Sequence, residues 1–140
     1  MKRFRFLLII AVMMTVLYVL GKLTEPPHTI TVQEYDNRLV ISSKSGCEIV
    51  IAYDDLHGLR FDRIMDFGTE VSGLNTRKEK SGIWKNEEFG EYFCCADGTL
   101  DFGLIVITGS QVIVFNYESE EETLRLHDIL AHELTIDCEG

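Results

Sequence analysis

Residues 102–117 read FGLIVITGSQVIVFNY, two runs rich in β-branched side chains on either side of the pair Gly109-Ser110. Such side chains favour strands, and a two-residue Gly-Ser connection between two such runs is typical of a tight β-hairpin. We therefore predict strands at 102–108 and 111–117. A hairpin of this kind makes a mainly β domain the first expectation.

The residues after the hairpin predict a helix. Ser119, with Glu122 three positions later, forms a capping-box pattern, and the two glutamates between them suit the positive end of a helix dipole. An apolar face follows at near-helical spacing and consists of Leu126, Ile129, Leu130 and Leu134. We expect this amphipathic helix to close the domain.

Apolar and polar residues alternate in several short stretches before the hairpin, and turn residues separate these stretches. The predicted strands are 28–34, 38–42, 47–52, 59–63 and 88–95. Together with the hairpin they give about seven antiparallel strands in a domain at 29–134, which a tail at 135–140 follows. Residues 66–82 hold three glycines and the run Arg77-Lys78-Glu79-Lys80, so we expect a solvated loop there.

The amino-terminal end predicts a membrane anchor at 1–23. Residues 6–20 read FLLIIAVMMTVLYVL, in which only Thr15 is polar. With Gly21 the uncharged run makes a helix of about 24 Å, so Arg5 and Lys22 must snorkel to match a hydrocarbon core of roughly 30 Å. A cleaved signal is the alternative, but no pair of small residues marks a cleavage site. A buried soluble helix would show a polar stripe, which this run lacks.

Charge predicts the orientation of the anchor and excludes some partners. Three bases precede the apolar run and one follows it, which favours a cytoplasmic amino terminus and a domain outside the cell membrane. The proline-containing linker at 24–28 separates the anchor from the domain. Residues 24–140 hold 9 of the 13 Lys and Arg residues and all 23 acids, a net charge of −14. So acidic a domain is expected to repel both nucleic acids and anionic lipid headgroups. Membrane contact is therefore assigned to residues 1–23.

Three stretches resemble the bacterial members of the pleckstrin-homology-like superfamily: IAYDDLHGLRF (51–61), SGIWKNEEFGEY (81–92) and VIVFNYESEEETLRLHDIL (112–130). The resemblance implies a bent antiparallel β-barrel or sandwich that the last helix closes at one end. Relatives that bind inositol phosphates use a basic cluster between the first two strands. Here the loop Tyr35-Asp36-Asn37-Arg38 holds one base and one acid, so no phosphoinositide binding is expected.

The four cysteines, Cys47, Cys94, Cys95 and Cys138, leave several states open. Neighbouring residues of a strand point to opposite faces, so Cys94 and Cys95 are not expected to bond to each other. One of them could meet Cys47 while the other reaches Cys138, or all four could be free or buried. Their spacing matches no zinc site. The thiols at 94 and 95 are also not a hallmark of the family that the chain resembles.

Other candidate residues favour structural roles. Asp54, Asp55 and His57 could serve acid–base or metal chemistry, but a polar turn that closes two strands is the favoured interpretation. His127 and His132 are five residues apart and lie on different faces of the predicted helix. Trp84, Phe89 and Tyr92 form the densest aromatic group. Phe89 is expected to pack in the core, whereas Trp84 either packs on the domain or presents a partner-binding surface. We therefore expect no catalytic, cofactor or metal site.

These observations give three functional hypotheses. The first is a non-catalytic, membrane-anchored module that binds a protein or peptide, with 66–82 and Trp84 flanking the site. The second is an accessory subunit of a membrane complex that assembles through its anchor helix. The third is an enzyme whose site has no recognisable motif.

Overall fold

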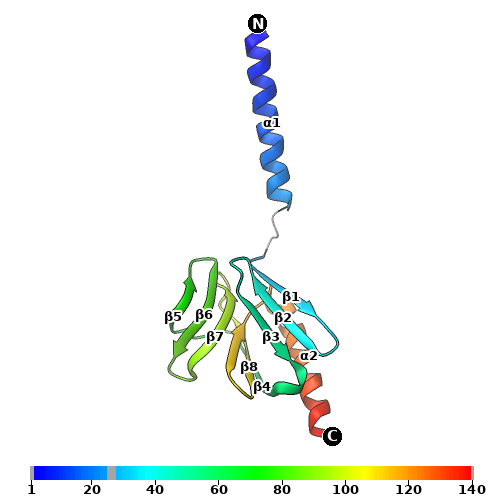
Figure 1. Ribbon diagram of the computed structural model, residues 1–140, viewed down its shortest axis with the longest axis vertical. Coiled ribbons are helices and arrows are strands. Elements are labelled where there is room, and N and C mark those ends of the chain that lie inside the picture. Colours follow the sequence, from blue (N-terminus) through cyan, green and yellow to red (C-terminus); the bar gives the residue numbers. More distant parts are fainter. Residues whose placement is uncertain (1, 25–27, 140) are drawn as a thin grey trace.

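The computed structural model describes residues 2–24 and 28–139 (Figure 1). The predicted apolar helix is confirmed as α1 (Lys2–Thr24), which stands apart from the β domain. Its segment Phe6–Leu23 is long and apolar enough to cross a membrane, and none of it is buried against the rest of the chain. The linker predicted at 24–28 falls largely on residues outside the described part of the chain.

The first three strands form a small antiparallel sheet. They are β1 (Ile30–Glu34), β2 (Arg38–Ser43) and β3 (Glu48–Ala52), in the spatial order β1-β2-β3. Alternate residues of the central strand, Leu39 and Ile41, are fully buried, while the residues between them face outward. The period of two therefore sets which face of this sheet enters the core. The 3₁₀ turn η1 (Tyr53–Asp55) leads out of this sheet.

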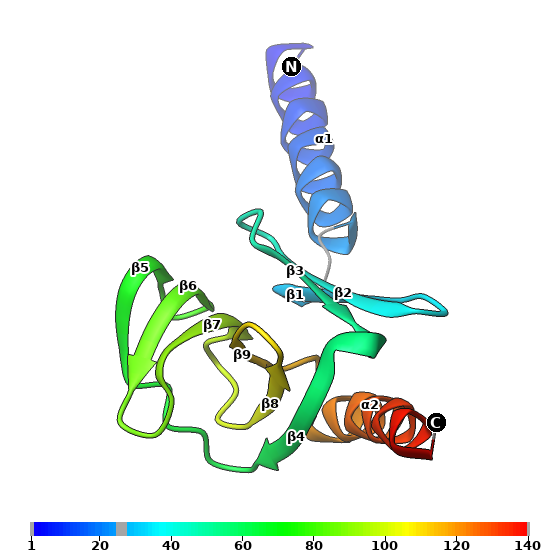
Figure 2. The same cartoon turned by 60° about the horizontal axis from the view of Figure 1, so that its bottom comes forward.

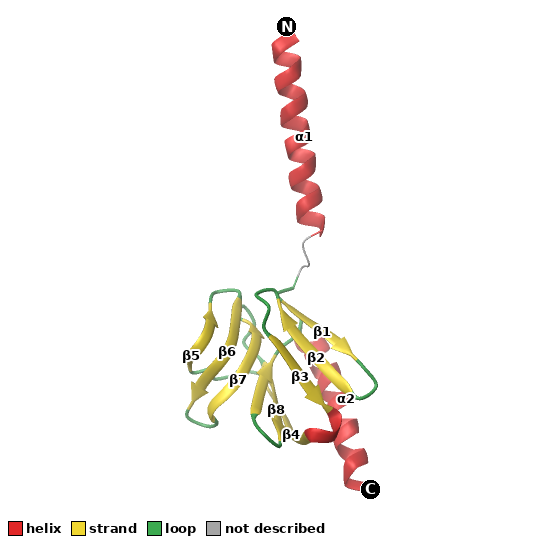
Figure 3. Cartoon of the chain, in the orientation of Figure 1, coloured by secondary structure: helices red, strands yellow, loops and turns green. Residues whose placement is uncertain are grey.

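The other six strands form a second, wider sheet. They are β4 (Leu56–Asp62), β5 (Thr69–Asn75), β6 (Glu79–Asn86), β7 (Gly90–Asp97), β8 (Gly103–Thr108) and β9 (Val112–Phe115), in the order β4-β8-β9-β7-β6-β5. Figure 3 labels β4, β5, β6, β7 and β8 of this sheet. The predicted hairpin is confirmed as the antiparallel pair β8 and β9. Strand β9 then lies between β8 and β7 and pairs with β7 in parallel, so this sheet is not purely antiparallel.

The expected number of strands and the loop expected at 66–82 are wrong. The described residues form nine strands rather than about seven, because residues 66–82 form β5 and the start of β6 instead of a solvated loop. Six of the seven residues of β5 are exposed, so this strand has no apolar alternation by which to recognise it. The expected mainly β fold is confirmed. Of its two expected forms, barrel or sandwich, the structure has the sandwich-like one, because the sheets do not close into a barrel.

One core joins the two sheets to the helix α2 (Glu120–Glu139). Its fully buried members come from β2, β3, β7, β8, β9 and α2, and include Leu39, Ile51, Leu104, Phe115, Leu126 and Leu130. The predicted helix cap is confirmed, because the Glu122 backbone N–H donates to the Ser119 hydroxyl at 3.2 Å. The helix continues through 135–139, beyond its predicted apolar face.

A second cluster lies on the opposite face of the wide sheet. The chain leaves β4 at one edge and enters β5 at the other, so residues 63–68 must cross the sheet between them. Met65 and Phe67 of this crossing pack against a cluster that contains Trp84 and Tyr92. The Tyr92 hydroxyl donates to the backbone carbonyl of Phe67 and fixes the crossing to the sheet.

The buried face of α2 gives a test of this core. Leu130→Ala removes a fully buried side chain and should lower the free energy of unfolding by about 2–5 kcal/mol. Leu124→Ala on the same helix removes a side chain that is 37% exposed and should cost less than about 1 kcal/mol. Urea denaturation followed by the fluorescence of the single Trp84 measures both. Equal losses in the two variants would show that α2 is peripheral.

Candidate functional site

Among the residues considered for acid–base or metal chemistry, Asp55 makes a hydrogen bond that connects two parts of the fold. The Asp55 carboxylate accepts a hydrogen bond from the Gly109 backbone N–H at 3.2 Å, which ties η1 to the turn between β8 and β9. His57, the second residue of β4, lies beside this contact, and His127 and His132 lie apart on α2. Within the described residues no three His, Cys, Asp or Glu side chains are grouped to hold a metal ion. The geometry therefore supports the polar-turn interpretation of 54–57.

A shallow pocket of about 440 Å³ lies beside the loop between β1 and β2. It is lined by Asp36, Asn37, Arg38, Ala52, Tyr53, Asp54 and Glu133. Burial, followed by the negative charges of Glu133, Glu34 and Asp36, raises the pKa of the Tyr53 hydroxyl. The Arg38 guanidinium lies over the Tyr35 ring at 4.6 Å. Three carboxylates around one arginine make a poor environment for a phosphate group.

The aromatic group of β6 and β7 does not form a binding surface. Trp84 is 1% exposed, and its indole N–H donates to the Ser81 carbonyl at 3.2 Å. Phe89 meets Tyr92 edge to face, with ring centroids 5.8 Å apart. Phe89 thus packs against the second cluster, as predicted, and of the two positions left open for Trp84 the structure shows the buried one.

The strand β5 is the least covered element of the domain. It pairs with β6 on one side only, and it lies at the edge of the wide sheet farthest from α2 (Figure 2). The opposite edge, β4, packs against α2. An edge strand leaves a row of backbone N–H and C=O groups without strand partners, and such a row can pair with another polypeptide. The segment 66–82 thus provides an open edge.

Two glycines hold the backbones of β5 and β6 close together. Gly73 and Gly82 are register partners with φ of 147° and 98°. A Cβ on Gly73 would lie 2.1 Å from the Ser81 carbonyl oxygen, and one on Gly82 would lie 2.3 Å from that of Ser72. Other residues therefore do not fit at these positions. A bulge between Glu70 and Ser72 bends the edge further, a feature that limits uncontrolled pairing.

The hairpin of β5 and β6 differs from the rest of the domain in charge. Residues 69–86 hold two acids and four bases, whereas the rest of 24–140 holds 21 acids and five bases. In the described part of the chain, Arg77, Lys78 and Lys85 form no ion pair, while Arg60, Arg63 and Arg125 are all paired with carboxylates. The side chains of Val71 and Ile83 are 49% and 39% exposed. The edge is thus positively charged and partly apolar.

A buried glutamate fixes this hairpin to the small sheet. Glu79, at the start of β6, is only 3% exposed. Its carboxylate accepts hydrogen bonds from the Ser45 hydroxyl, from the Ser45 backbone N–H at 3.4 Å and from the Ser81 hydroxyl at 3.0 Å. Ser45 belongs to the turn between β2 and β3, so the contact joins the two sheets. The sequence placed Glu79 in a solvated charged run and gave no sign of this role.

The cysteines occupy different positions. Cys94 and Cys95 lie on opposite faces of β7, as predicted, because Cys94 belongs to the second cluster and Cys95 to the core between the sheets. Both are fully buried, Cys47 is half-buried, and all three are free thiols. Burial and then the proximity of Cys47 raise the pKa of the Cys94 thiol, which donates to the Lys80 carbonyl at 3.4 Å. The Cys138 side chain lies outside the described residues.

No protein-family model, no curated protein and no solved structure matches this chain. The resemblance to bacterial pleckstrin-homology-like proteins stays a prediction. A function must therefore be inferred from the structure of this chain itself. The open edge of β5 is the main feature from which to infer it.

The role of Glu79 can be tested against a neighbouring glutamate. Glu79→Ala removes a buried acceptor of three hydrogen bonds and leaves the buried Ser81 hydroxyl without this partner, so it should lower the free energy of unfolding by about 1–3 kcal/mol. Glu70→Ala, on the exposed face of β5, should change it by less than about 0.5 kcal/mol. Urea titrations of the two variants compare them directly. A neutral Glu79→Ala would mean that the junction contributes nothing to stability.

Proposed function

We propose that this protein is a non-catalytic interaction module, held at the cell envelope by α1, whose β5 edge binds an extended segment of another polypeptide. The observation that carries the proposal is the uncovered edge of β5. A segment that aligns with such an edge gains backbone hydrogen bonds, and its alternate side chains meet the neighbouring surface. Membership of the bacterial pleckstrin-homology-like group is part of this proposal.

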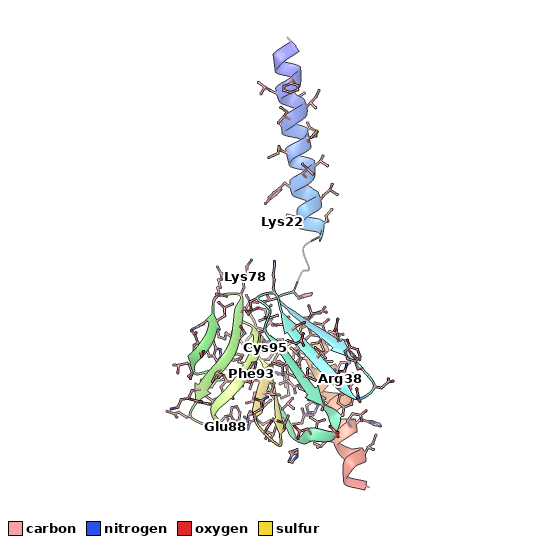
Figure 4. All side chains as sticks on the ribbon, in the orientation of Figure 1. Lys22, Arg38, Lys78, Glu88, Phe93 and Cys95 are labelled. Atoms are coloured by element: carbon pink, nitrogen blue, oxygen red, sulfur yellow. The ribbon has the colours of Figure 1, made fainter. Side chains whose placement is uncertain are left out.

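The path of the chain supports a location of the β5–β6 turn near the membrane. The Lys44 backbone N–H, in the turn after β2, donates to the Thr29 carbonyl at 3.0 Å, close to the start of the domain. Residues 24–28 reach at most about 18 Å even when fully extended. The same β2–β3 turn binds Glu79, which follows the β5–β6 turn. Figure 4 places Lys78 at the end of the domain that faces Lys22.

The charge of the hairpin supports a partner segment that is acidic and has strand-forming residues. Three cations without ion pairs surround an edge that also exposes Val71 and Ile83. These cations attract a carboxylate on the partner. The same carboxylate would be repelled elsewhere on the domain, where acids outnumber bases. Because the edge begins near the bilayer, we propose that the partner is a membrane protein or a polypeptide secreted across the membrane.

The orientation of the anchor gives the first functional test. With Lys2, Arg3 and Arg5 held in the cytoplasm, the domain should be accessible from outside the cell. Protease added to intact spheroplasts should remove a tag placed after Gly140 while a cytoplasmic marker stays intact. Replacing the three bases with Gln should lower the digested fraction. A tag that resists protease until the cells are lysed would reverse the orientation.

The proposed binding edge of β5 gives the second functional test. A photo-reactive amino acid at Val71, on β5, should form a discrete adduct in native membranes. The matched control is Val50 on β3, whose exposure of 51% is close to the 49% of Val71 and which should give no such adduct. Reversing the charges with Arg77→Glu and Lys78→Glu should lower the yield at Val71 several-fold. Equal yields at positions 71 and 50, or a yield that ignores the charge reversal, would contradict the proposal.

A further inference from the structure

Cys47 and Cys95 lie close to the junction between the two sheets. Cys47 lies directly before β3 of the small sheet, and Cys95 lies in β7 of the wide sheet. The hydrogen bonds of Glu79 connect Ser45, two residues before Cys47, with Ser81, which is the register partner of Cys95. Cys95 is a buried member of the core between the sheets, and Cys47 packs against this same core cluster from the small sheet. The hydrogen bonds of Glu79 therefore hold the two segments that carry these cysteines together across the junction.

We propose that Cys47 and Cys95 form a disulfide bond that covalently joins the two sheets. Bonding needs two sulfur atoms about 2.05 Å apart with Cβ atoms about 3.8 Å apart, and the shared core cluster brings the two side chains together from different sheets. Cys94 is not the partner, because it lies on the other face of β7 with its thiol directed at the Lys80 carbonyl. Within the described side chains, Cys95 is thus the partner available to Cys47.

The unequal burial of the Cys47 and Cys95 thiols predicts which of them reacts first when the disulfide forms. Cys47 is half-buried and open to solvent, whereas Cys95 is fully buried. The Cys47 thiolate attacks a disulfide donor, forms a mixed disulfide and releases one donor thiol. The Cys95 sulfur then attacks the Cys47 sulfur, releases the second donor thiol and passes its proton to that leaving group. Two protein thiols are oxidised while one donor disulfide is reduced to two thiols.

The bond would affect the unfolded chain more than the native fold. It closes a loop between positions 47 and 95 that contains the whole β5–β6 hairpin. Linking residues so far apart removes conformational freedom chiefly from the unfolded chain. The native hydrogen bonds of Glu79 already hold the two sides together. Oxidation should therefore raise stability without changing which strand edges are open.

The test uses the purified full chain in detergent, equilibrated with oxidised and reduced glutathione and then alkylated. Cleavage after Lys and Arg places Cys47 in peptide 45–60, Cys94 and Cys95 in 86–125, and Cys138 in 126–140. Mass spectrometry without reduction should find 45–60 joined to 86–125 in the parent and in Cys94→Ala. The joined species should be absent from Cys47→Ala and Cys95→Ala. Reduction should lower the melting temperature of the parent, by on the order of 10 °C, but not that of Cys47→Ala.

Three results would overturn the proposal. Separate alkylation of Cys47 and Cys95 throughout the glutathione series would show that the pair does not bond. A link that persists in Cys95→Ala but is lost in Cys94→Ala would assign the bond to Cys94. A bond from Cys47 to peptide 126–140 or to a second chain would assign it elsewhere. Because the protein is purified, these outcomes are independent of the side of the membrane on which the domain lies.

Discussion

The wide sheet has more strands than the small sheet and α2 can cover, and this mismatch determines the rest of the structure. The core between the layers takes its fully buried residues from the small sheet, α2, β7, β8 and β9. On the other face, the crossing at 63–68 covers a second cluster that includes Trp84. Apolar burial supplies most of the driving force for folding, so the chain organises around these two clusters. Strand β5 lies beyond the core and remains an open edge.

The sequence predicted those elements whose burial leaves a periodic pattern. The hairpin at 102–117, the capped helix after it and the small sheet all place apolar residues on one buried face, and all were found where expected. Strand β5 was missed because nearly all of it is exposed, so its residues carry no alternation. The parallel pairing of β7 with β9 was missed because it depends on where β8 lies, which no local pattern records.

The candidate site could be predicted only in part, because some of its contacts join segments that are distant in the sequence. The sequence marked 66–82 as unusual by its glycines and charges, and the open edge lies there. It could not distinguish Glu79 from the charged residues beside it, because the donors that bury Glu79 come from Ser45 and Ser81 on different sheets. It also could not select a partner for Cys47. Contacts between distant segments require the fold, and the junction that Glu79 makes with Ser45 and Ser81 is such a contact.

The central claim is that β5 is an open edge which a partner segment covers at the membrane. Hydrogen–deuterium exchange of the β5 amides, compared between the purified chain in detergent and the same chain in its native membrane, tests this claim most directly. The account predicts fast exchange of the outward-facing β5 amides in the purified chain and slower exchange in the membrane, with β8 and β9 protected in both. Identical exchange of β5 in the two preparations, or full protection already in the purified chain, would contradict it.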